Sequence, residues 1–426
     1  MKNLFHLFRL IKILFLIRGA FSCGDLLTKT LKTLGPVFIK FGQSLSTRAD
    51  IVGEEIADKL MELQDKLPSF SFDQVKQIIE SEFGGKLSDH FSYFEEKPIA
   101  AASIAQVHRA ITCDGTKVAV KVRRPKIVKE FAKDIDFLYF IAGLAEKFIP
   151  KAKKHSPKEI VAIFDKSSKF ELDFCFEAAA LSEMRENFSG DESVYIPKPY
   201  WDLTSHLVLT MDWVEGIPIN DLDAIDKASI DRKKIASNLS ILFFNQAYRN
   251  GFFHGDLHGG NILVNDKHQI ILIDFGITGR LSKKDRIFVA NVLKSFLEHD
   301  YLNVAKIHYE EGFITNPEDI VYFAQTCRSI GEQIVGLSAN KMSVAKLLSR
   351  LFKACDDYDM NTRPQLLLLQ KTILMVEGIG SRLDPSINMW KLAEPWIEQW
   401  AIENLGIEAK LLEFAQKISS KIKEMI

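Results

Sequence analysis

The sequence has little that would fit a disulfide-stapled or nucleic-acid-binding protein. Its five cysteines are scattered and form no Cys-x-x-Cys pair, so we expect reduced thiols in a reducing compartment and no zinc site. The 55 Lys and Arg residues are balanced by 56 Asp and Glu residues, which gives a formal net charge of −1. Such a balance gives no overall attraction to nucleic acid, and no partner of that class is expected.

The sequence also lacks an unbroken apolar run of the roughly 20 residues that a membrane-spanning helix needs. Residues 1–24 still differ from the rest, because basic side chains alternate there with apolar and aromatic ones and the first acid is Asp25. A cleavable secretory signal is not predicted. We expect a basic amphipathic helix that lies on an anionic membrane surface. A helix that docks on its own protein is the alternative.

Helical periodicity dominates the chain outside two strand-rich stretches. Residues 97–122 predict a hairpin around Asp114-Gly115, and Leu207 to Met211 read as a buried strand. Gly216-Ile-Pro218 then breaks the pattern. The chain therefore predicts an α+β fold in four parts: a membrane-surface segment 1–24, a helical extension 25–95, a strand-rich lobe with inserted helices 96–215, and a helical lobe 216–426.

The segment from His254 to Gly276 carries the chemistry of phosphoryl transfer. Asp256 is placed to orient an attacking hydroxyl or accept its proton, and Asn261 follows five residues later as a metal ligand. Asp274 opens Asp-Phe-Gly and would bind Mg²⁺ that bridges the phosphates. This spacing is typical of a kinase catalytic loop and metal loop, and it predicts ATP and Mg²⁺ as cofactors. A chance run of polar turn residues would not reproduce it.

Upstream, Lys121 ends Val-Ala-Val-Lys and matches the strand lysine that binds nucleotide phosphates. Val107 lies fourteen residues before it and closes a small-residue segment that matches the kinase phosphate-covering loop. Because alanine stands in the glycine places at 100, 102 and 105, we expect altered nucleotide handling. The residues predicted to bind nucleotide are Ala100, Ala101, Ala102, Ser103, Ile104, Ala105, Val107 and Lys121.

The lysine needs an acidic partner from a helix. Glu130 is close in sequence, whereas Glu177 lies in Glu-Leu-Asp-Phe-Cys-Phe-Glu further along. The residues alone do not choose between the two.

Taken together, five segments within residues 30–280 resemble the UbiB family of atypical kinase-like proteins, also called the aarF-domain family. Its KxGQ motif is similar to Lys40-Phe-Gly42-Gln43, and the alanine-rich loop, lysine strand, ExD motif and catalytic loops follow in family order. The resemblance implies a two-lobed protein-kinase-like fold, with a helical N-terminal extension and helices inserted in the N-lobe. It favours Glu177 as the partner of Lys121.

The resemblance also implies roles for residues that, from their side chains and spacing alone, would be interpreted as lying on a solvated surface. Lys40, Gly42 and Gln43 would form an active-site lid from the N-terminal extension, together with Glu171 and Asp173. Two departures stand out. Gly259 replaces a proline that is usual in the family's catalytic loop, which would loosen the loop. Residues 390–426 contain no long apolar run, so membrane attachment would depend on residues 1–24.

The family is linked to ubiquinone biosynthesis. The resemblance therefore implies an ATP-dependent kinase or ATPase that acts on a quinone precursor or another lipid or small molecule, with other ubiquinone-biosynthesis enzymes as possible partners. A peripheral position on the cytoplasmic face of a bacterial inner membrane, or on an equivalent organelle membrane, follows. Direct hydroxylation is disfavoured, since neither a dinucleotide fingerprint nor an iron triad is evident.

Two alternatives remain open. One is a small-molecule phosphotransferase that resembles aminoglycoside or choline kinases, and the other is a non-catalytic nucleotide-binding scaffold. After Gly276 the chain has no long activation segment and no Ala-Pro-Glu. We therefore expect poor phosphorylation of protein substrates.

Overall fold

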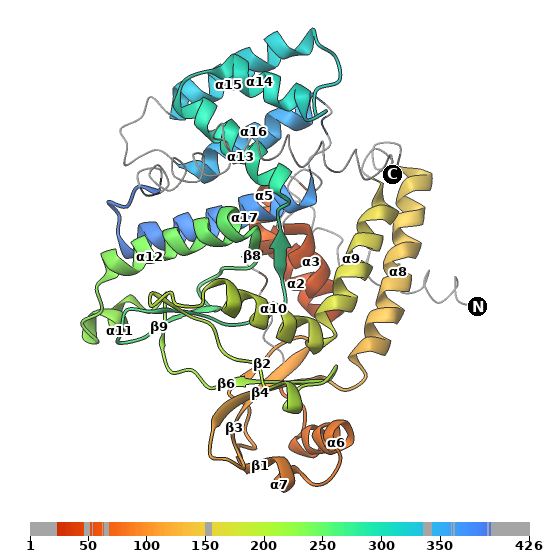
Figure 1. Ribbon diagram of the computed structural model, residues 1–426. Helices are drawn as coiled ribbons and strands as arrows, with labels where there is room; N and C mark the ends of the chain where they lie inside the picture. Colours follow the sequence, from red (N-terminus) through yellow and green to blue (C-terminus); the bar gives the residue numbers. More distant parts are fainter. Residues whose placement is uncertain are drawn as a thin grey trace, which may run out of the picture. The chain divides into compact units, whose positions relative to one another are not determined.

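The computed structural model describes residues 24–46, 52, 54–61, 63, 68–149, 156–334, 343–358, 360, 363–389 and 392 (Figure 1). The chain forms two compact units. Unit 1 holds the described residues up to Ser189, with Ile196–Glu215 and Asp274–Ile277. Unit 2 holds Gly190–Tyr195, Gly216–Ile273 and the described residues from Thr278 onward. The Asp-Phe-Gly segment thus packs with unit 1, although its sequence neighbours on both sides belong to unit 2.

A five-stranded antiparallel sheet organises unit 1. The order is β1-β3-β4-β6, and β2 pairs with β3. The strands are β1 (Phe91–Phe94), β2 (Ala100–Ala101), β3 (Ala105–Thr112), β4 (Lys117–Arg123) and β6 (Val208–Asp212). The predicted hairpin is confirmed as β3 and β4, in a register that sets Val107 opposite Lys121.

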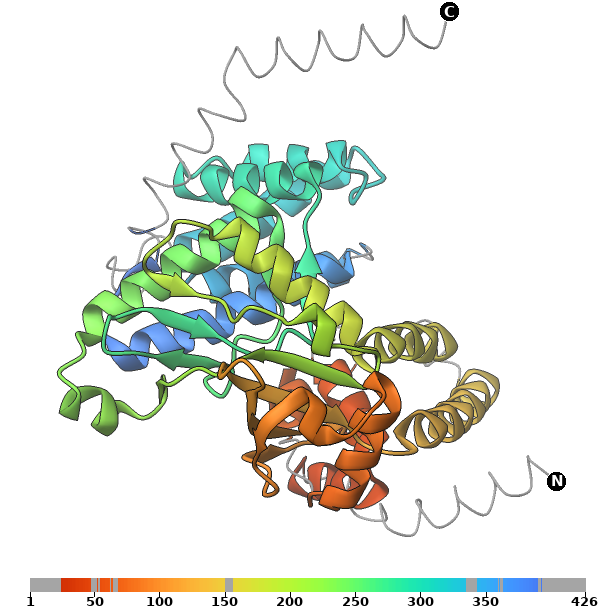
Figure 2. The same cartoon turned by 60° about the horizontal axis from the view of Figure 1, so that its bottom comes forward.

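The core of this sheet explains why β4 reads as a run of small and β-branched residues. Val118, Val120 and Val122 are fully buried, and they pack with Val75 and Ile79 of the helix that covers the sheet. Figure 2 shows that helix, α6 (Phe72–Phe83), beside the orange strands. A strand buried on both faces needs this composition, so the lysine within it stands out.

Helices make up the rest of unit 1, as predicted from the sequence. They are α2 (Gly24–Leu34), α3 (Pro36–Ser46), α5 (Glu54–Met61), α7 (Leu87–His90), α8 (Ile127–Phe148), α9 (Pro157–Glu171) and α10 (Phe174–Asn187). The helices α8 and α9 run side by side (Figures 1 and 2). Phe38 of α3 packs against Phe137 of α8 with ring centroids 6.3 Å apart. The N-terminal extension is thereby joined to the inserted helices.

Unit 2 combines two small sheets with helices. One sheet has the order β5-β10-β9-β7, and the other pairs β11 with β8. The strands are β5 (Val194–Tyr195), β7 (Ile217–Pro218), β8 (Phe252–His254), β9 (Ile262–Val264), β10 (Ile270–Leu272) and β11 (Thr278–Arg280). The strand β8 leads into the predicted catalytic loop, and β9 leaves it.

The helices of unit 2 carry most of its core. They are α11 (Leu222–Lys227), α12 (Arg232–Phe244), the π-helical turn η4 (Asn245–Asn250), α13 (Lys283–Leu297), α14 (Tyr301–Glu310), α15 (Asp319–Ile334), α16 (Val344–Asp357) and α17 (Pro364–Leu383). The helices α12 and α17 lie side by side (Figure 1), and α17 also contacts β11. Since β11 pairs with β8, α17 lies next to the catalytic loop.

No helix in the described part of the chain is both long and apolar enough to cross a membrane. The predicted membrane-surface segment, apart from Gly24 at the start of α2, lies outside the described residues, and so do nearly all of residues 390–426.

Candidate active site

The predicted strand lysine is buried in a bidentate ion pair. Lys121 on β4 is 7% exposed. Its Nζ donates to Glu177 Oε1 and Oε2 at 2.9 and 3.0 Å. Glu177 is itself buried in the first turn of α10, whereas Glu130 on α8 is exposed. Of the two acids that the sequence left open, the structure pairs Glu177 with the lysine.

Asp274 completes this cluster, with its Oδ2 3.3 Å from Lys121 Nζ. Burial alone would lower the pKa of Lys121, but the charges of Asp274 and Glu177 outweigh burial and raise it, so the lysine stays an ammonium. Burial raises the pKa of Glu177, and Lys121 acts against that rise. The ammonium is therefore the group that makes a buried carboxylate tolerable here.

Asp274 has the exposure and backbone expected of a functional residue. Its side chain is 51% exposed, although its partner Lys121 is buried. Its backbone φ is +60°, in the left-handed region that residues other than glycine rarely adopt. A Cβ added at Gly276 would lie 3.3 Å from Asp274 Oδ1 and 3.7 Å from Glu171 Cγ. Glu171 therefore lies beside the Asp-Phe-Gly turn.

The charges of this cluster fit Mg²⁺ with a nucleotide. Glu171, Glu177 and Asp274 supply three carboxylates, and Lys40 and Lys121 supply two ammonium groups, so the set carries −3 + 2 = −1. A surplus carboxylate that is open to solvent suits a hard cation. An ammonium on a buried strand suits phosphate oxygens.

The KxGQ residues lie on one helix, α3, but make different contacts. Lys40 Nζ forms an ion pair with Glu171. Gln43 Nε2 donates to the Leu63 carbonyl at 3.0 Å. A Cβ at Gly42 would lie 2.6 Å from Leu63 Cδ1, so glycine is needed for close packing onto that leucine. Only Lys40 reaches the acidic cluster, whereas Gly42 and Gln43 hold the extension together.

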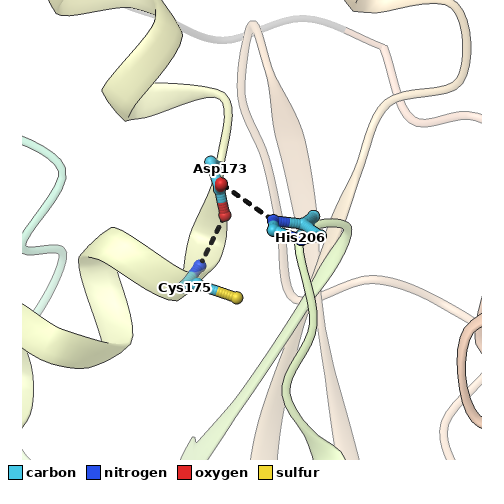
Figure 3. Close-up of side chains that lie close together, drawn as sticks. All are labelled: Asp173, Cys175 and His206. Atoms are coloured by element: carbon cyan, nitrogen blue, oxygen red, sulfur yellow. Dashed lines mark hydrogen bonds and ion pairs between the residues drawn. The ribbon is translucent and has the colours of Figure 1, made fainter.

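Asp173 contacts Cys175 and His206 (Figure 3). Its Oδ1 accepts from the backbone N–H of Cys175 at 3.0 Å and caps α10, and its Oδ2 lies 2.8 Å from His206 Nδ1. Ligand atoms of Asp173, Cys175 and His206 lie within 4.8 Å of one another, a donor set that a transition metal could use. Because both carboxylate oxygens are already engaged, the arrangement is sufficiently explained as a helix cap held by a histidine.

The alanine-rich segment is a hairpin tip. Ala100 and Ala101 form β2 opposite Val107 and Gln106, and the backbone N–H of Ala102 donates to the Ala105 carbonyl at 2.8 Å. Ser103, Ile104 and Ala105 are buried. The segment is therefore an ordered turn, and its small side chains let it close tightly.

Arg124 holds this hairpin tip through hydrogen bonds to its backbone carbonyls. Its guanidinium donates to the carbonyls of Ser103, Ala102 and Pro68 at 3.2, 3.1 and 2.9 Å. Its own N–H donates to the Ile104 carbonyl at 2.8 Å. Burial lowers the pKa of the guanidinium. One arginine thus fixes the carbonyl side of the predicted nucleotide loop.

The catalytic loop in unit 2 is held by its own residues. The backbone N–H of Asp256 donates to His254 Nδ1 at 3.1 Å, and Asn261 Nδ2 donates to the Asp256 carbonyl at 3.0 Å. That bond uses the amide nitrogen of Asn261, so its carbonyl oxygen is the atom suited to a metal ion. The Asp256 carboxylate meets Lys371 of α17, whose Nζ lies 3.3 Å from Oδ1.

Gly259 packs closely against a neighbouring side chain. A Cβ at this position would overlap the side-chain amide of Asn220, which fills the space. Asn220 Oδ1 in turn accepts from Arg382 of α17 at 3.0 Å. A neighbouring side chain therefore occupies the space that a proline ring would take, while the expected loosening of the loop stays a prediction.

Sequence reasoning missed two of these residues. Arg124 follows the lysine strand directly in Val-Arg-Arg-Pro, and that position could have drawn attention to it. Lys371 is the single charged residue between Pro364 and Val376, in an otherwise apolar helical run. A charge on an apolar helix face is a signal that it has a partner.

Comparison with known proteins identifies the family of the chain. Residues 62–308 match the ABC1 atypical kinase-like domain, and residues 327–388 match the UbiB helical domain. Proteins named probable protein kinase UbiB from Marinobacter nauticus and Pseudomonas entomophila are 40% and 39% identical to the chain. These alignments cover 90% and 92% of the chain, and 71% and 73% of the relatives.

A solved structure supports the fold independently. The Rv3197–erythromycin complex from Mycobacterium tuberculosis matches with a TM-score of 0.51 at 22% identity, covering 81% of this chain and 91% of that one. The α+β, two-lobed kinase-like fold is thereby confirmed. By its sequence match over most of its length, the chain belongs to the UbiB family of ABC1 atypical kinase-like proteins.

Proposed function

We propose that the protein binds Mg-ATP and uses it, as a phosphotransferase or ATPase of the UbiB type, in support of ubiquinone biosynthesis. One observation carries the nucleotide part: a buried ammonium, Lys121, lies between a buried carboxylate and the half-exposed Asp274. Apolar residues of similar volume would pack at least as stably here, so a ligand-binding role is the better explanation of the charges. The ubiquinone part follows from the name that the relatives share.

Each unit would supply part of the chemistry. In unit 1, Lys121 would bind phosphate oxygens of the nucleotide, with Glu177 holding its side chain in place, and Asp274 would hold Mg²⁺. When bound, the ion neutralises charge on the phosphates. In unit 2, Asn261 would offer its side-chain oxygen to a metal ion. Asp256 would orient the attacking hydroxyl or water and take its proton as the new P–O bond forms and the bond to ADP breaks.

The acceptor is proposed to be a lipid or small molecule, with quinone precursors as the favoured class. Gly276 is followed almost directly by β11, which pairs with β8, and α13 then begins at Lys283 with Ser282 as its cap. This short connection offers no extended segment on which a peptide could dock. We propose a peripheral position on the cytoplasmic face of a bacterial inner membrane, or its organelle equivalent, attached through residues 1–24.

The test is Mg²⁺-dependent ATP turnover by the purified protein, with and without anionic liposomes and a phenolic mimic of a quinone precursor. Asp274→Asn should abolish turnover, whereas Asp266→Asn, in an exposed turn, should not change it. Stimulation by lipid or phenol would support coupling to quinone chemistry. Nucleotide binding without turnover would favour a scaffold, and no binding would refute the proposal.

A further inference from the structure

A lysine from the C-terminal helical domain contacts the predicted catalytic aspartate. Lys371 lies on α17, in the part that matches the UbiB helical domain and beyond residue 308, where the match to the kinase-like domain ends. Its Nζ is 3.3 Å from Asp256 Oδ1, and the two side chains are 10% and 25% exposed. A largely buried lysine has to be compensated by a partner, and here the partner is the catalytic carboxylate.

The backbone and the side chain of Asp256 are held by different parts of the chain. Within the loop, His254 and Asn261 fix the backbone N–H and carbonyl of Asp256. The neighbouring His258 reaches no closer than 3.7 Å to Asp256 Oδ2, which is beyond hydrogen-bond distance. Lys371 thus contacts the carboxylate from outside the loop.

The helix that carries Lys371 is held in place by burial and by ion pairs. The residues that follow the lysine, Thr372 and Ile373, are buried. Arg363 precedes the helix and donates to Asp285 and Glu311 at 2.6 and 3.0 Å. A charge on a fixed helix can hold a carboxylate in one rotamer, which a mobile surface lysine could not do.

We propose that Lys371 is a positioning residue for phosphoryl transfer. Its ammonium, delivered by α17, holds the Asp256 carboxylate in the orientation that aligns the nucleophile, so the helical domain completes the catalytic loop. The inference rests on the proposed function. According to this inference, the helical domain supplies a side chain that orients the catalytic aspartate, in addition to packing against the kinase-like domain.

The experiment compares steady-state ATP turnover of the wild-type full chain with that of five variants. Lys371→Met should lower kcat about tenfold or more while the KM for Mg-ATP changes less than about twofold. Lys371→Arg should recover most of kcat, because it restores the charge. Lys294→Met, which removes a lysine from an exposed ion pair with Glu298, should behave as wild type. In an Asp256→Asn background, Lys371→Met should cause no further loss.

Three results would overturn the proposal: kcat of Lys371→Met within about twofold of wild type, a loss confined to KM, or losses that multiply in the Asp256→Asn background. If Lys371→Met does not fold, Lys371→Gln replaces it, because it keeps a hydrogen-bond donor without the charge.

Hydrogen exchange of the loop, residues 252–264, separates this inference from the proposed function. Lys371→Met should speed exchange there and Lys371→Arg should not, whether or not the wild type turns over ATP. Faster loop exchange in a protein without turnover would refute the proposed function but keep the inference that Lys371 holds Asp256 in place. Unchanged loop exchange would refute the positioning role even in an active enzyme.

Discussion

Removing the Lys121 ammonium should destabilise unit 1 strongly. In Lys121→Met, Glu177 remains buried without its partner. At an effective dielectric of about 20, one contact at 2.9 Å corresponds to about 6 kcal/mol of attraction. Desolvation of both groups opposes this attraction, and the net cost of breaking such a buried pair is about 3–5 kcal/mol.

The double variant Lys121→Met/Glu177→Gln should cost less than Lys121→Met alone, because it leaves no buried charge. Asp274, the third member of the cluster, is half-exposed and can be hydrated. A surface control is Lys294→Met with Glu298→Gln, whose side chains are 54% and 59% exposed. That pair should contribute less than about 1 kcal/mol.

Amide hydrogen exchange on peptides from β4 and α10 measures the effect within unit 1. The expected cost corresponds to about 10²- to 10⁴-fold faster exchange in Lys121→Met. Glu177→Gln should speed exchange less than Lys121→Met does, because Lys121 still has Asp274 as a charged partner. Exchange in Lys121→Met within about fivefold of wild type, or a double variant as costly as the sum of the two single ones, would refute the electrostatic reasoning.

Three further predictions concern other residues. Arg124→Lys should weaken Mg-ADP binding by about tenfold in calorimetry, because a single ammonium nitrogen cannot replace the planar guanidinium, whose Nε and terminal nitrogen reach three carbonyls from separate positions; unchanged affinity would contradict this. Burial lowers the pKa of His308 to about 4. The stability that the neutral imidazole contributes is therefore fully present above about pH 6.5 and is lost as the pH falls through 4. In urea titrations, the wild type should lose about 3 kcal/mol more than His308→Leu between pH 7 and pH 4, and equal losses in the two proteins would contradict this reasoning. Gly259→Ala should lower the melting temperature by crowding Asn220, and Asn220→Ala should restore it; no rescue would rule out the clash.

Much of the chemistry could be predicted from local sequence. The spacing of Asp256, Asn261 and Asp274 and the position of Lys121 in a strand are short-range patterns, since a turn or strand fixes which neighbours face together. The β3–β4 hairpin follows from the same alternation and from its Asp-Gly turn. The turnover experiments above test the roles of these residues.

Only the tertiary structure decided which distant residues meet. Glu177 lies 56 residues from Lys121, Lys371 lies 115 from Asp256, and Glu171 lies 131 from Lys40. Each pairing depends on how the intervening helices pack. The periodicity of apolar side chains predicts which face of a helix is buried, but it does not predict which element covers that face. The sequence by itself therefore determined the family and predicted the type of chemistry, while packing decided which charges compensate one another.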